Sequence, residues 1–322
     1  MTSIGMTSSG MTSTDMTSTG MTPTHMAAPF VVAVAKHAIG APADFEAFAR
    51  RQRASLLQAR AHGASIAVLP EYLSLELAAG FGDAVRGDLA ASLAALQAHR
   101  QAWLALFSGL ARETGMHLVA GSFLLDVGGG RYRNRSDVFS PRGAHGWQDK
   151  LQLTGFEKRA GMIGPGDALR VFDADGLRFG VAVCYDIEFP LPVRAQCMAG
   201  ARLLLVPSCT DTAAGATRVR VGCLARALEN RCFVAQAVTA GEAAWSPALD
   251  VNTGEAAVYA PMDVGLPDDG MLAATRGGDA WAFATLDVAA LEAGRAQAQV
   301  ANDLDWPGQD APGLVRATVL PL

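Results

Sequence analysis

The chain of 322 residues has little charge and no excess of basic side chains. Only 18% of its residues are charged, and 26 Lys and Arg face 31 Asp and Glu, which gives a formal charge of −5 at pH 7. A protein that binds nucleic acid or an anionic membrane needs a basic surface to neutralise phosphates. No apolar run reaches the roughly 18 uncharged residues of a membrane span. We therefore expect no nucleic acid and no membrane as partner, and favour a soluble protein that acts on small molecules.

Cysteine and histidine are also scarce. The cysteines stand at positions 184, 197, 209, 223 and 232, an odd number with no CxxC pair, and no histidine follows His145. This set argues against a disulfide framework and, without a later histidine, against a Cys/His zinc site. We predict a cytoplasmic protein without a structural metal.

The first residues lack the patterns of a folded segment. Methionine recurs every five residues from Met1 to Met26, with mainly Thr, Ser and Gly between, and no apolar periodicity is present. Such a segment buries too little apolar surface to offset the entropy of ordering it. It also lacks the basic and apolar regions of a secretory signal. We predict that residues 1–29 form a disordered low-complexity tail.

From residue 30 onward, short apolar runs alternate with Ala-rich amphipathic stretches. The apolar runs predict strands at 30–35, 65–69, 117–125, 133–140, 169–173, 178–183, 203–207 and 233–237. Helical periodicity predicts helices at 44–61, 88–114, 191–199 and 216–230. The sequence Gly128-Gly129-Gly130 predicts a hairpin turn, because no helix opens after it. This rhythm indicates an α/β protein built in layers.

Three reactive side chains follow strand-like runs. Glu71 comes after the run 66–69, Lys150 after a strand-like stretch, and Cys184 after the run 179–183. In open α/β sheets, functional side chains tend to lie at the carboxyl ends of strands. Taken singly, the Glu and the Lys are more typical of solvated loops, and a buried cysteine is usually inert. At a strand-to-helix turn, however, the helix N-terminus should favour the Cys184 thiolate and offer N–H groups to an oxyanion.

A nucleophilic cysteine also needs a base. The order of papain, with Cys before His, is impossible here, while His62, His117 and His145 could serve only in a His-first order and have no distinctive context. A carboxylate base with an ammonium group is the more economical set, and Glu71 and Lys150 supply it.

These residues and their neighbours resemble the nitrilase (carbon–nitrogen hydrolase) superfamily. Glu71 lies in Leu-Pro-Glu-Tyr, Lys150 in Asp-Lys-Leu and Cys184 in Val-Cys-Tyr-Asp-Ile-Glu-Phe-Pro, in the order of that family. Glu157 matches its additional glutamate, and Arg194 an arginine on the helix after the nucleophile. The resemblance implies a single-domain, four-layer αββα sandwich over residues 30–290, which leaves residues 291–322 as a C-terminal extension.

The resemblance also implies a thioester mechanism without a cofactor. Glu71 would take the Cys184 proton, pass it to the departing ammonia or amine, and then activate water. Lys150 and the backbone N–H of Tyr185 would stabilise the oxyanion. Glu157 would orient Lys150, although the sequence alone is also compatible with a glutamate on a helix surface.

The residues after the nucleophile favour amide over nitrile hydrolysis. True nitrilases usually carry Cys-Trp-Glu, whereas this chain has Cys-Tyr-Asp, as amidase-like and carbamoylase-like branches do. Segments 207–212 and 227–233 are similar to a poorly characterised bacterial branch. The resemblance thus implies hydrolysis of a small amide or N-carbamoyl substrate, with thioester-based acyl transfer to an amine, nitrile hydrolysis and a non-catalytic interaction protein as alternatives. Family members commonly pair their sheets across a dimer interface, so we expect a homo-oligomer.

Several further residues are candidates for the pocket or its support. Arg194 is expected to make a structural ion pair with Asp186. Cys209 follows a predicted strand and could lie near the pocket, although a core position is favoured. The candidate pocket walls, each equally compatible with simple packing, are Tyr72, Tyr132, Trp147, Tyr185, Ser208 and Trp245.

Overall fold

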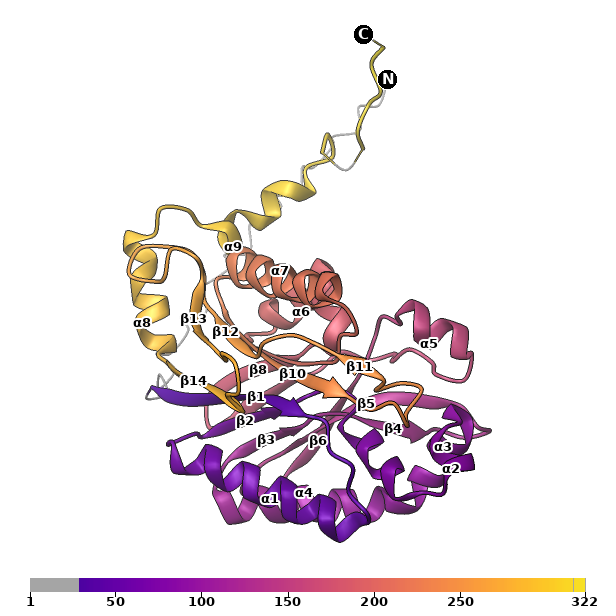
Figure 1. The fold of residues 1–322 in the computed structure, drawn as a ribbon. Coiled ribbons are helices and arrows are strands. Elements are labelled where there is room, and N and C mark those ends of the chain that lie inside the picture. Colours follow the sequence, from indigo (N-terminus) through magenta and orange to yellow (C-terminus); the bar gives the residue numbers. More distant parts are fainter. Residues whose placement is uncertain (1–28, 315, 322) are drawn as a thin grey trace, which may run out of the picture.

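Two β-sheets and the helices that cover them form four layers (Figure 1). The computed structural model describes residues 29–314 and 316–321, so the predicted N-terminal tail lies, except for its last residue, outside the described residues. The first sheet consists in spatial order of β4 (Phe123–Asp126), β5 (Tyr132–Phe139), β3 (His117–Ala120), β2 (Ile66–Leu69) and β1 (Phe30–Ala38), with β6 (His145–Asp149) beside β5 and β14 (Trp281–Leu286) beside β1.

The second sheet continues from the end of β1. Its strands are β10 (Phe233–Glu242), β9 (Leu203–Ser208), β8 (Leu177–Val181) and β7 (Val171–Ala174), with β11 (Val251–Asn252) and β12 (Ala257–Tyr259) paired to β10 and β13 (Met271–Ala274) paired to β12. The first part of β1 pairs with β2 and β14, whereas its residues 36–38 pair with β10. Because β1, β2 and β3 are parallel to one another, as are β8, β9 and β10, the carboxyl ends of these strands gather at one edge.

The alternation of side chains along β1 shows how the layers pack. Val32 and Val34 belong to the core between the sheets, while Ala33 and Ala35 face the outer helices of the first sheet. Successive residues of a strand point to opposite faces, and both faces of a central strand are buried here. This is why strands such as Ile66–Leu69 are continuous apolar runs in the sequence.

Paired helices cover the two outer faces (Figure 1). On the first sheet lie α1 (Phe45–Ala61) and α4 (Arg100–Thr114). Among their buried rings, Phe48 stacks on Trp103, and Phe107 meets both edge to face. On the second lie α6 (Pro190–Met198) and α7 (Ala213–Asn230). The expected αββα sandwich is confirmed.

Most predicted elements are present, with two breaks that the sequence did not indicate. The single helix predicted at 88–114 is wrong: it is divided into α3 (Leu89–Leu96), a 3₁₀ turn at Gln97–His99, and α4. The Gln97 amide donates to Leu124 O at 2.9 Å and its Oε1 accepts from Asp126 N at 3.0 Å, which ties this turn to β4. The predicted hairpin at Gly128–Gly130 is confirmed, and all three glycines have positive φ.

The second break divides the strand predicted at 117–125 into β3 and β4. At the break Gly121 has a φ of 66° and a Cβ there would lie 2.2 Å from Pro70 O. The next residue, Ser122, is hydrogen-bonded to the loop after β2, because its Oγ accepts from Tyr72 N at 2.8 Å. The break therefore brings the chain directly against the loop that follows β2.

The C-terminal residues first pack on the sandwich and then leave it. After α8 (Val288–Ala293), the ion pair of Arg295 with Asp303 at 2.7 Å holds α9 (Asn302–Asp305). Arg194 of α6 donates to Asp303 O and lies over the ring of Trp306. The last described residues extend away from the layers (Figure 1). The boundaries proposed for the folded domain and the C-terminal extension stay predictions.

None of the helices in residues 29–314 and 316–321 combines the length and the apolar character needed to cross a bilayer.

The packing of α7 gives a test of the fold. A Cβ on Gly222 would lie 3.0 Å from Ile187 O, in the short segment behind the predicted nucleophile, whereas a Cβ on Gly109 in α4 meets open space. We expect Gly222→Ala to lower the free energy of unfolding by about 1–2 kcal/mol through overpacking. The control Gly109→Ala should raise it by about 0.5–1 kcal/mol, because alanine favours helix. Urea unfolding of both variants measures this, and equal stabilisation would contradict the close packing.

Candidate active site

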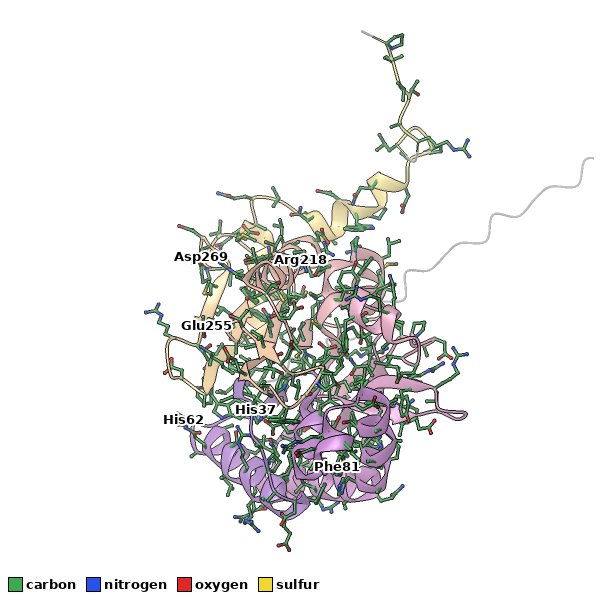
Figure 2. The ribbon with its side chains drawn as sticks, turned by 45° about the vertical axis from the view of Figure 1, so that its right-hand side comes forward. His37, His62, Phe81, Arg218, Glu255 and Asp269 are labelled. Atoms are coloured by element: carbon green, nitrogen blue, oxygen red, sulfur yellow. The ribbon has the colours of Figure 1, made fainter. Side chains whose placement is uncertain are left out.

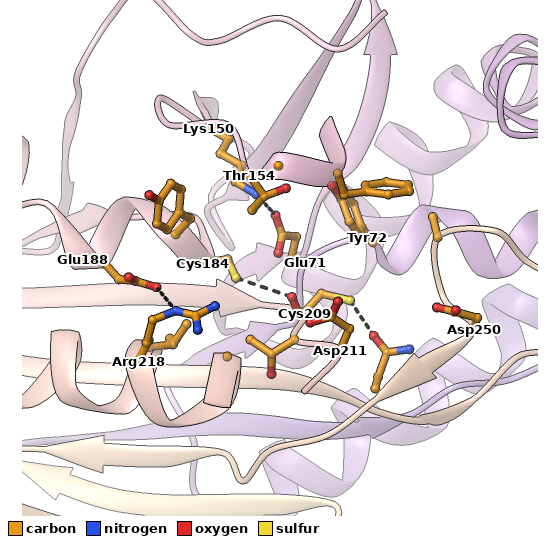
Figure 3. Close-up of a pocket in the computed structure, with 18 of the residues that line it drawn as sticks. Glu71, Tyr72, Lys150, Thr154, Cys184, Glu188, Cys209, Asp211, Arg218 and Asp250 are labelled. Carbon is orange, nitrogen blue, oxygen red and sulfur yellow. Dashed lines mark hydrogen bonds and ion pairs between the residues drawn. The ribbon is translucent and has the colours of Figure 1, made fainter. Parts of the chain in front are cut away.

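The three predicted reactive residues meet in one pocket at the carboxyl ends of the strands (Figure 3). The cavity measures about 400 Å³, and Glu71, Lys150 and Cys184 all line it. Their side chains come from the loops after β2, β6 and β8. Each is at least 95% buried, which excludes the solvated-loop interpretation of the Glu and the Lys.

The loop that carries Glu71 is held from two sides. Pro70 ends β2, and Tyr72 adopts a left-handed φ of 61° before the 3₁₀ helix Leu73–Gly80. Tyr72 N donates to Ser122 Oγ at 2.8 Å, and Thr239 Oγ1 of β10 donates to Glu71 O at 2.9 Å. The backbone of Glu71 is thus hydrogen-bonded to the second sheet, while Tyr72, the next residue, is hydrogen-bonded to the first.

Cys184 lies at a sharp turn between β8 and the 3₁₀ segment Cys184–Glu188. Its φ is 51°, a left-handed value that is unusual for a residue with a Cβ. Strained backbone of this kind persists only where the surroundings fix it and is concentrated at functional sites. The turn directs the thiol into the pocket beside Glu71 (Figure 3).

Asp186 joins the loops of Lys150 and Cys184. Its carboxylate accepts from Gln152 N at 2.7 Å, from Leu151 N at 3.1 Å, and from Val183 N at 3.2 Å. Burial raises the pKa of Asp186 to about 7 even though three backbone N–H groups donate to it. Two segments that come from different sheets are therefore fixed to each other by one side chain.

The ion pair expected between Arg194 and Asp186 is wrong. Arg194 instead donates to Asn230 Oδ1 at 3.4 Å and to Asp303 O at 2.8 Å. The main-chain donors already occupy Asp186, and Arg194 lies on the side of α6 that meets the C-terminal segment. Its role is structural, as expected, but with other partners.

Lys150 lies between two buried carboxylates. Its Nζ is 2.8 Å from Glu71 Oε1 and 2.9 Å from Glu157 Oε2. Glu157 is on α5 (Gly155–Ala160), where Thr154 and Glu157 form a capping box, and its side chain is fully buried. The interpretation of Glu157 as a helix-surface glutamate is therefore wrong.

The two carboxylates differ sharply in the donors that they accept. Glu157 Oε2 accepts from Lys150, from Thr154 N at 2.8 Å and from Thr154 Oγ1 at 3.1 Å, while its Oε1 accepts from Tyr72 OH at 2.8 Å. Glu71 receives Lys150 and the Asn134 amide, at 2.8 Å, on Oε1. Glu157 is therefore far better provided with donors.

This difference separates the pKa values of the two groups. Burial, together with the charge of Glu157, raises the pKa of Glu71, and the Lys150 ammonium offsets this only in part. Burial acts the same way on Glu157, but the charge of Lys150 and the hydrogen bonds from Lys150, Thr154 and Tyr72 lower its pKa below the ordinary value. Burial disfavours the charge of Lys150, yet the two carboxylates raise its pKa. Glu157 and Lys150 thus stay charged, and Glu71 is the group poised to exchange a proton.

The expectation that the turn favours a Cys184 thiolate is wrong. Burial and the charge of Glu71 raise the pKa of Cys184 well above that of a free thiol, and Lys150 offsets this only in part. The resting side chain is a neutral thiol, whose Sγ lies 3.5 Å from Cys209 O. A base must therefore remove its proton before it can attack.

Not all of the predicted wall residues reach the pocket. Tyr72 and Tyr185 line it, as does Cys209, whose Sγ lies 2.8 Å from Asn252 Oδ1. Ser208 is fully buried in β9, and Tyr132 packs in the core beneath α1 and α4. Trp147 and Trp245 also lie outside the pocket. Trp147 contacts the guanidinium groups of Arg135 and Arg170, and Trp245 packs against the same core as Tyr132.

None of the three histidines considered as bases, His62, His117 and His145, lines this cavity. His62 stacks on Phe283 at the flank of the first sheet (Figure 2), and His145 bonds Asp137 at 3.0 Å. Among the described residues, no three His, Cys, Asp or Glu side chains are grouped as metal ligands would be.

Sequence reasoning missed several residues of the site. Asn134, within β5, bonds the carboxylates, and Arg218 of α7 pairs with Glu188 at 3.7 Å at the mouth (Figure 3). Asp211 and Asp250 complete the charged rim. An Asn at an inward position of a predicted strand was the one available signal, since buried polar side chains need partners.

The carbon-nitrogen hydrolase family model matches residues 31–263 of the sequence, well over half of the chain. The chain therefore belongs to the carbon–nitrogen hydrolase family, and the resemblance to the nitrilase superfamily is confirmed. Curated relatives include the "Probable hydrolase YhcX" of Bacillus subtilis, 28% identical over 249 residues, 77% of this chain and 48% of the relative. Omega-amidase NIT2-B of Xenopus laevis is 29% identical over 164 residues, 48% of this chain and 58% of that protein. The chain thus spans about half the length of these relatives.

Solved structures share the fold. Nit3 of Saccharomyces cerevisiae, a member of branch 10 of the nitrilase superfamily, superimposes with a TM-score of 0.68 at 21% identity, over 84% of this chain and 95% of Nit3. An amidase from Nesterenkonia sp. gives a TM-score of 0.61 at 25% identity, over 83% of this chain and 94% of the amidase.

The link made by Asp186 gives a second test. In Asp186→Ala three backbone donors, one buried and two partly buried, lose their acceptor. We therefore expect the free energy of unfolding to fall by about 2 kcal/mol. We also expect slower alkylation of Cys184 by iodoacetamide, because its turn is no longer fixed to the Lys150 loop. The comparison variant Arg194→Ala should leave that alkylation rate unchanged. Equal effects of both substitutions on the rate would show that Asp186 does not position the thiol.

Proposed function

We propose that this protein hydrolyses the carbon–nitrogen bond of a small amide or N-carbamoyl compound through a thioester on Cys184. The observation that carries the proposal is the arrangement of a buried thiol, the raised-pKa carboxylate of Glu71 and the Lys150 ammonium around one cavity of about 400 Å³. Membership of a carbon–nitrogen hydrolase family and the amidases among its relatives support this reaction class. The activity of the whole protein is proposed, because the chain covers only part of the curated relatives.

In the first step Glu71 acts as general base. It takes the proton of the Cys184 thiol while the sulfur forms a bond to the carbonyl carbon of the substrate. Negative charge then develops on the carbonyl oxygen. Lys150, and the backbone N–H of Tyr185 directly after the nucleophile, are the groups available to stabilise that charge.

In the second step Glu71 passes this proton to the substrate nitrogen. Glu71 protonates the nitrogen, the carbon–nitrogen bond breaks, and ammonia or an amine leaves a thioester on Cys184. Glu71, ionised again, takes a proton from water as the water oxygen attacks the thioester carbon. Collapse of that intermediate releases the acid, and Glu71 returns the proton to the sulfur.

Glu157 has a different role from Glu71 in this proposal. Because its lowered pKa keeps it charged, it holds the Lys150 ammonium in place and does not exchange protons. Tyr72, which donates to Glu157, also lines the cavity.

The five free cysteines support the proposal that the protein works in the reducing environment of the cytoplasm.

The nucleophile can be tested against the second thiol of the same pocket. We expect Cys184→Ala to abolish ammonia release from a panel of small amides and the acyl adduct seen by intact-protein mass spectrometry, because the thioester cannot form. Cys209→Ala, which removes the other pocket thiol, should still form the adduct. Ammonia release by Cys184→Ala at the rate of the parent protein would refute the mechanism.

The same measurement distinguishes the alternative reactions. With hydroxylamine present, formation of a hydroxamate in preference to the acid would indicate acyl transfer. Ammonia release from nitriles but not from amides would indicate a nitrilase, and neither adduct nor product across the panel would indicate a non-catalytic protein.

We also propose that the chain forms a homo-oligomer through the outer face of its second helical layer. Large apolar side chains are exposed there, Leu191 at 72% and Met198 at 74% on α6 and Val221 at 57% on α7. Exposed apolar side chains grouped on one face mark association surfaces. The C-terminal segment, which carries exposed Leu304 and Leu314, leaves the sandwich from this same side (Figure 1).

Association through this face predicts a change in mass on substitution. We expect light scattering after size exclusion to give a dimer or larger species for the parent protein. The double substitution Leu191→Asp with Met198→Asp should yield monomers, because two charges would be buried at the interface. The control Val127→Asp, at an exposed apolar residue of the β4–β5 hairpin, should not change the mass. A monomeric parent protein would refute the proposal.

A further inference from the structure

We propose that Asn134 is the positioning residue that assigns the two oxygens of Glu71 their roles, holding Oε1 so that Oε2 is the atom that exchanges the proton with Cys184. The inference rests on the proposed function, and it concerns a residue of β5 that sequence reasoning missed. Its basis is the set of hydrogen bonds that converge on the carboxylate from the first sheet.

Both nitrogen donors of Glu71 reach the same oxygen. Asn134 Nδ2 and Lys150 Nζ each lie 2.8 Å from Oε1. The Cys184 thiol lies beside this carboxylate in the same pocket (Figure 3). Since an oxygen that already accepts an ammonium and an amide N–H is a poor proton acceptor, Oε2 is the better base.

The second hydrogen of the same amide points to the other carboxylate. Asn134 Nδ2 lies 3.4 Å from Glu157 Oε1, so one NH₂ group bridges Glu71 and Glu157. The cluster contains two carboxylates and a single ammonium, all buried. Lys150 alone cannot neutralise both, and the amide adds two donors without adding a charge that would have to be balanced.

The other end of Asn134 shows that the amide serves these carboxylates. Asn134 is 1% exposed, and its Oδ1 is buried without a hydrogen-bond partner. Leaving a buried carbonyl oxygen unsatisfied is unfavourable. Rotating the amide by half a turn would bring that oxygen against two carboxylate oxygens, which is worse. The orientation is thus fixed by Glu71 and Glu157.

The two donors to Oε1 determine which oxygen of Glu71 carries the proton during the reaction. When Glu71 holds the proton taken from Cys184, its Oε1 still accepts from Asn134 and Lys150, so the proton stays on Oε2. Because Glu71 lines the pocket and Oε1 is occupied by Asn134 and Lys150, Oε2 is the oxygen left to protonate the substrate nitrogen there. The bridge therefore prevents the carboxylic acid from rotating its proton away from the leaving group.

The test is the pH profile of the nucleophile. In Asn134→Ala, Glu71 loses a donor to its ionised form, so the acid limb of Cys184 alkylation by iodoacetamide, and of kcat/KM, should move to higher pH by about one unit. The isosteric Asn134→Asp should move it further, because a third carboxylate raises the pKa of its neighbours. Above the shifted limb the alkylation rate should recover.

A matched control lies on the same strand. Ser136, two residues along β5, is also fully buried and its Oγ also lacks a partner. Ser136→Ala should leave the acid limb unchanged. A merely structural role of Asn134 would lower stability in Asn134→Ala and Asn134→Asp without moving either limb, and that result would overturn the inference.

The two readouts separate failure of this inference from failure of the proposed function. Alkylation needs no substrate, so the shift can be measured even if no amide is hydrolysed. Amide hydrolysis that depends on Cys184, with an acid limb that neither substitution moves, would refute the role of Asn134 alone. A protein that hydrolyses nothing but shows the shift in alkylation would refute the proposed reaction alone.

Discussion

The buried ammonium of Lys150 between Glu71 and Glu157 is the interaction on which the rest of the site depends. A charged group that is 1% exposed is tolerable only if its partners are close and their remaining lone pairs are satisfied. The two carboxylates meet this condition unequally. Besides Lys150, Glu157 accepts four hydrogen bonds, two from Thr154, one from Tyr72 and one from Asn134. Glu71 accepts only one besides Lys150, from Asn134. This inequality makes one carboxylate a fixed countercharge and leaves the other able to titrate.

The fold provides the cluster by bringing loops from two sheets to one edge. Three devices fix their relative positions: Asp186 bonds the loop of Lys150 to that of Cys184, Thr239 bonds the Glu71 loop to the second sheet, and Gly121 lets the chain pass against Pro70. Each is a contact between segments far apart in the sequence. The precision of the site thus comes from tertiary bonds that no local pattern of residues reveals.

The sequence was most informative where local physics decides the outcome. The sequence located β1 to β5 and β7 to β10 through their apolar runs, since these strands are largely buried, but it did not predict β11 to β14. Through the tendency of functional side chains to lie at the carboxyl ends of strands, it also located Glu71, Lys150 and Cys184. It failed where a distant partner decides, as at the 3₁₀ turn of Gln97, which a bond to β4 stabilises, and at Asp186, whose partners are main-chain groups. The neutral state of Cys184 was missed for the same reason, since burial and a nearby carboxylate outweigh the effect of the turn.

A neutral thiol beside a carboxylate is also the more useful starting state for breaking a carbon–nitrogen bond. An amide nitrogen leaves poorly unless it is protonated, so an enzyme that begins with a thiolate must obtain that proton elsewhere. In the mechanism proposed above, the proton is stored on the sulfur and moves to Glu71 during attack, which places it within reach of the nitrogen at the next step. The same desolvation that raises the pKa of Cys184 raises that of Glu71. In that mechanism one cavity sets both groups for a single shared proton, and Lys150 stays charged throughout because Glu157 takes no part in the transfer.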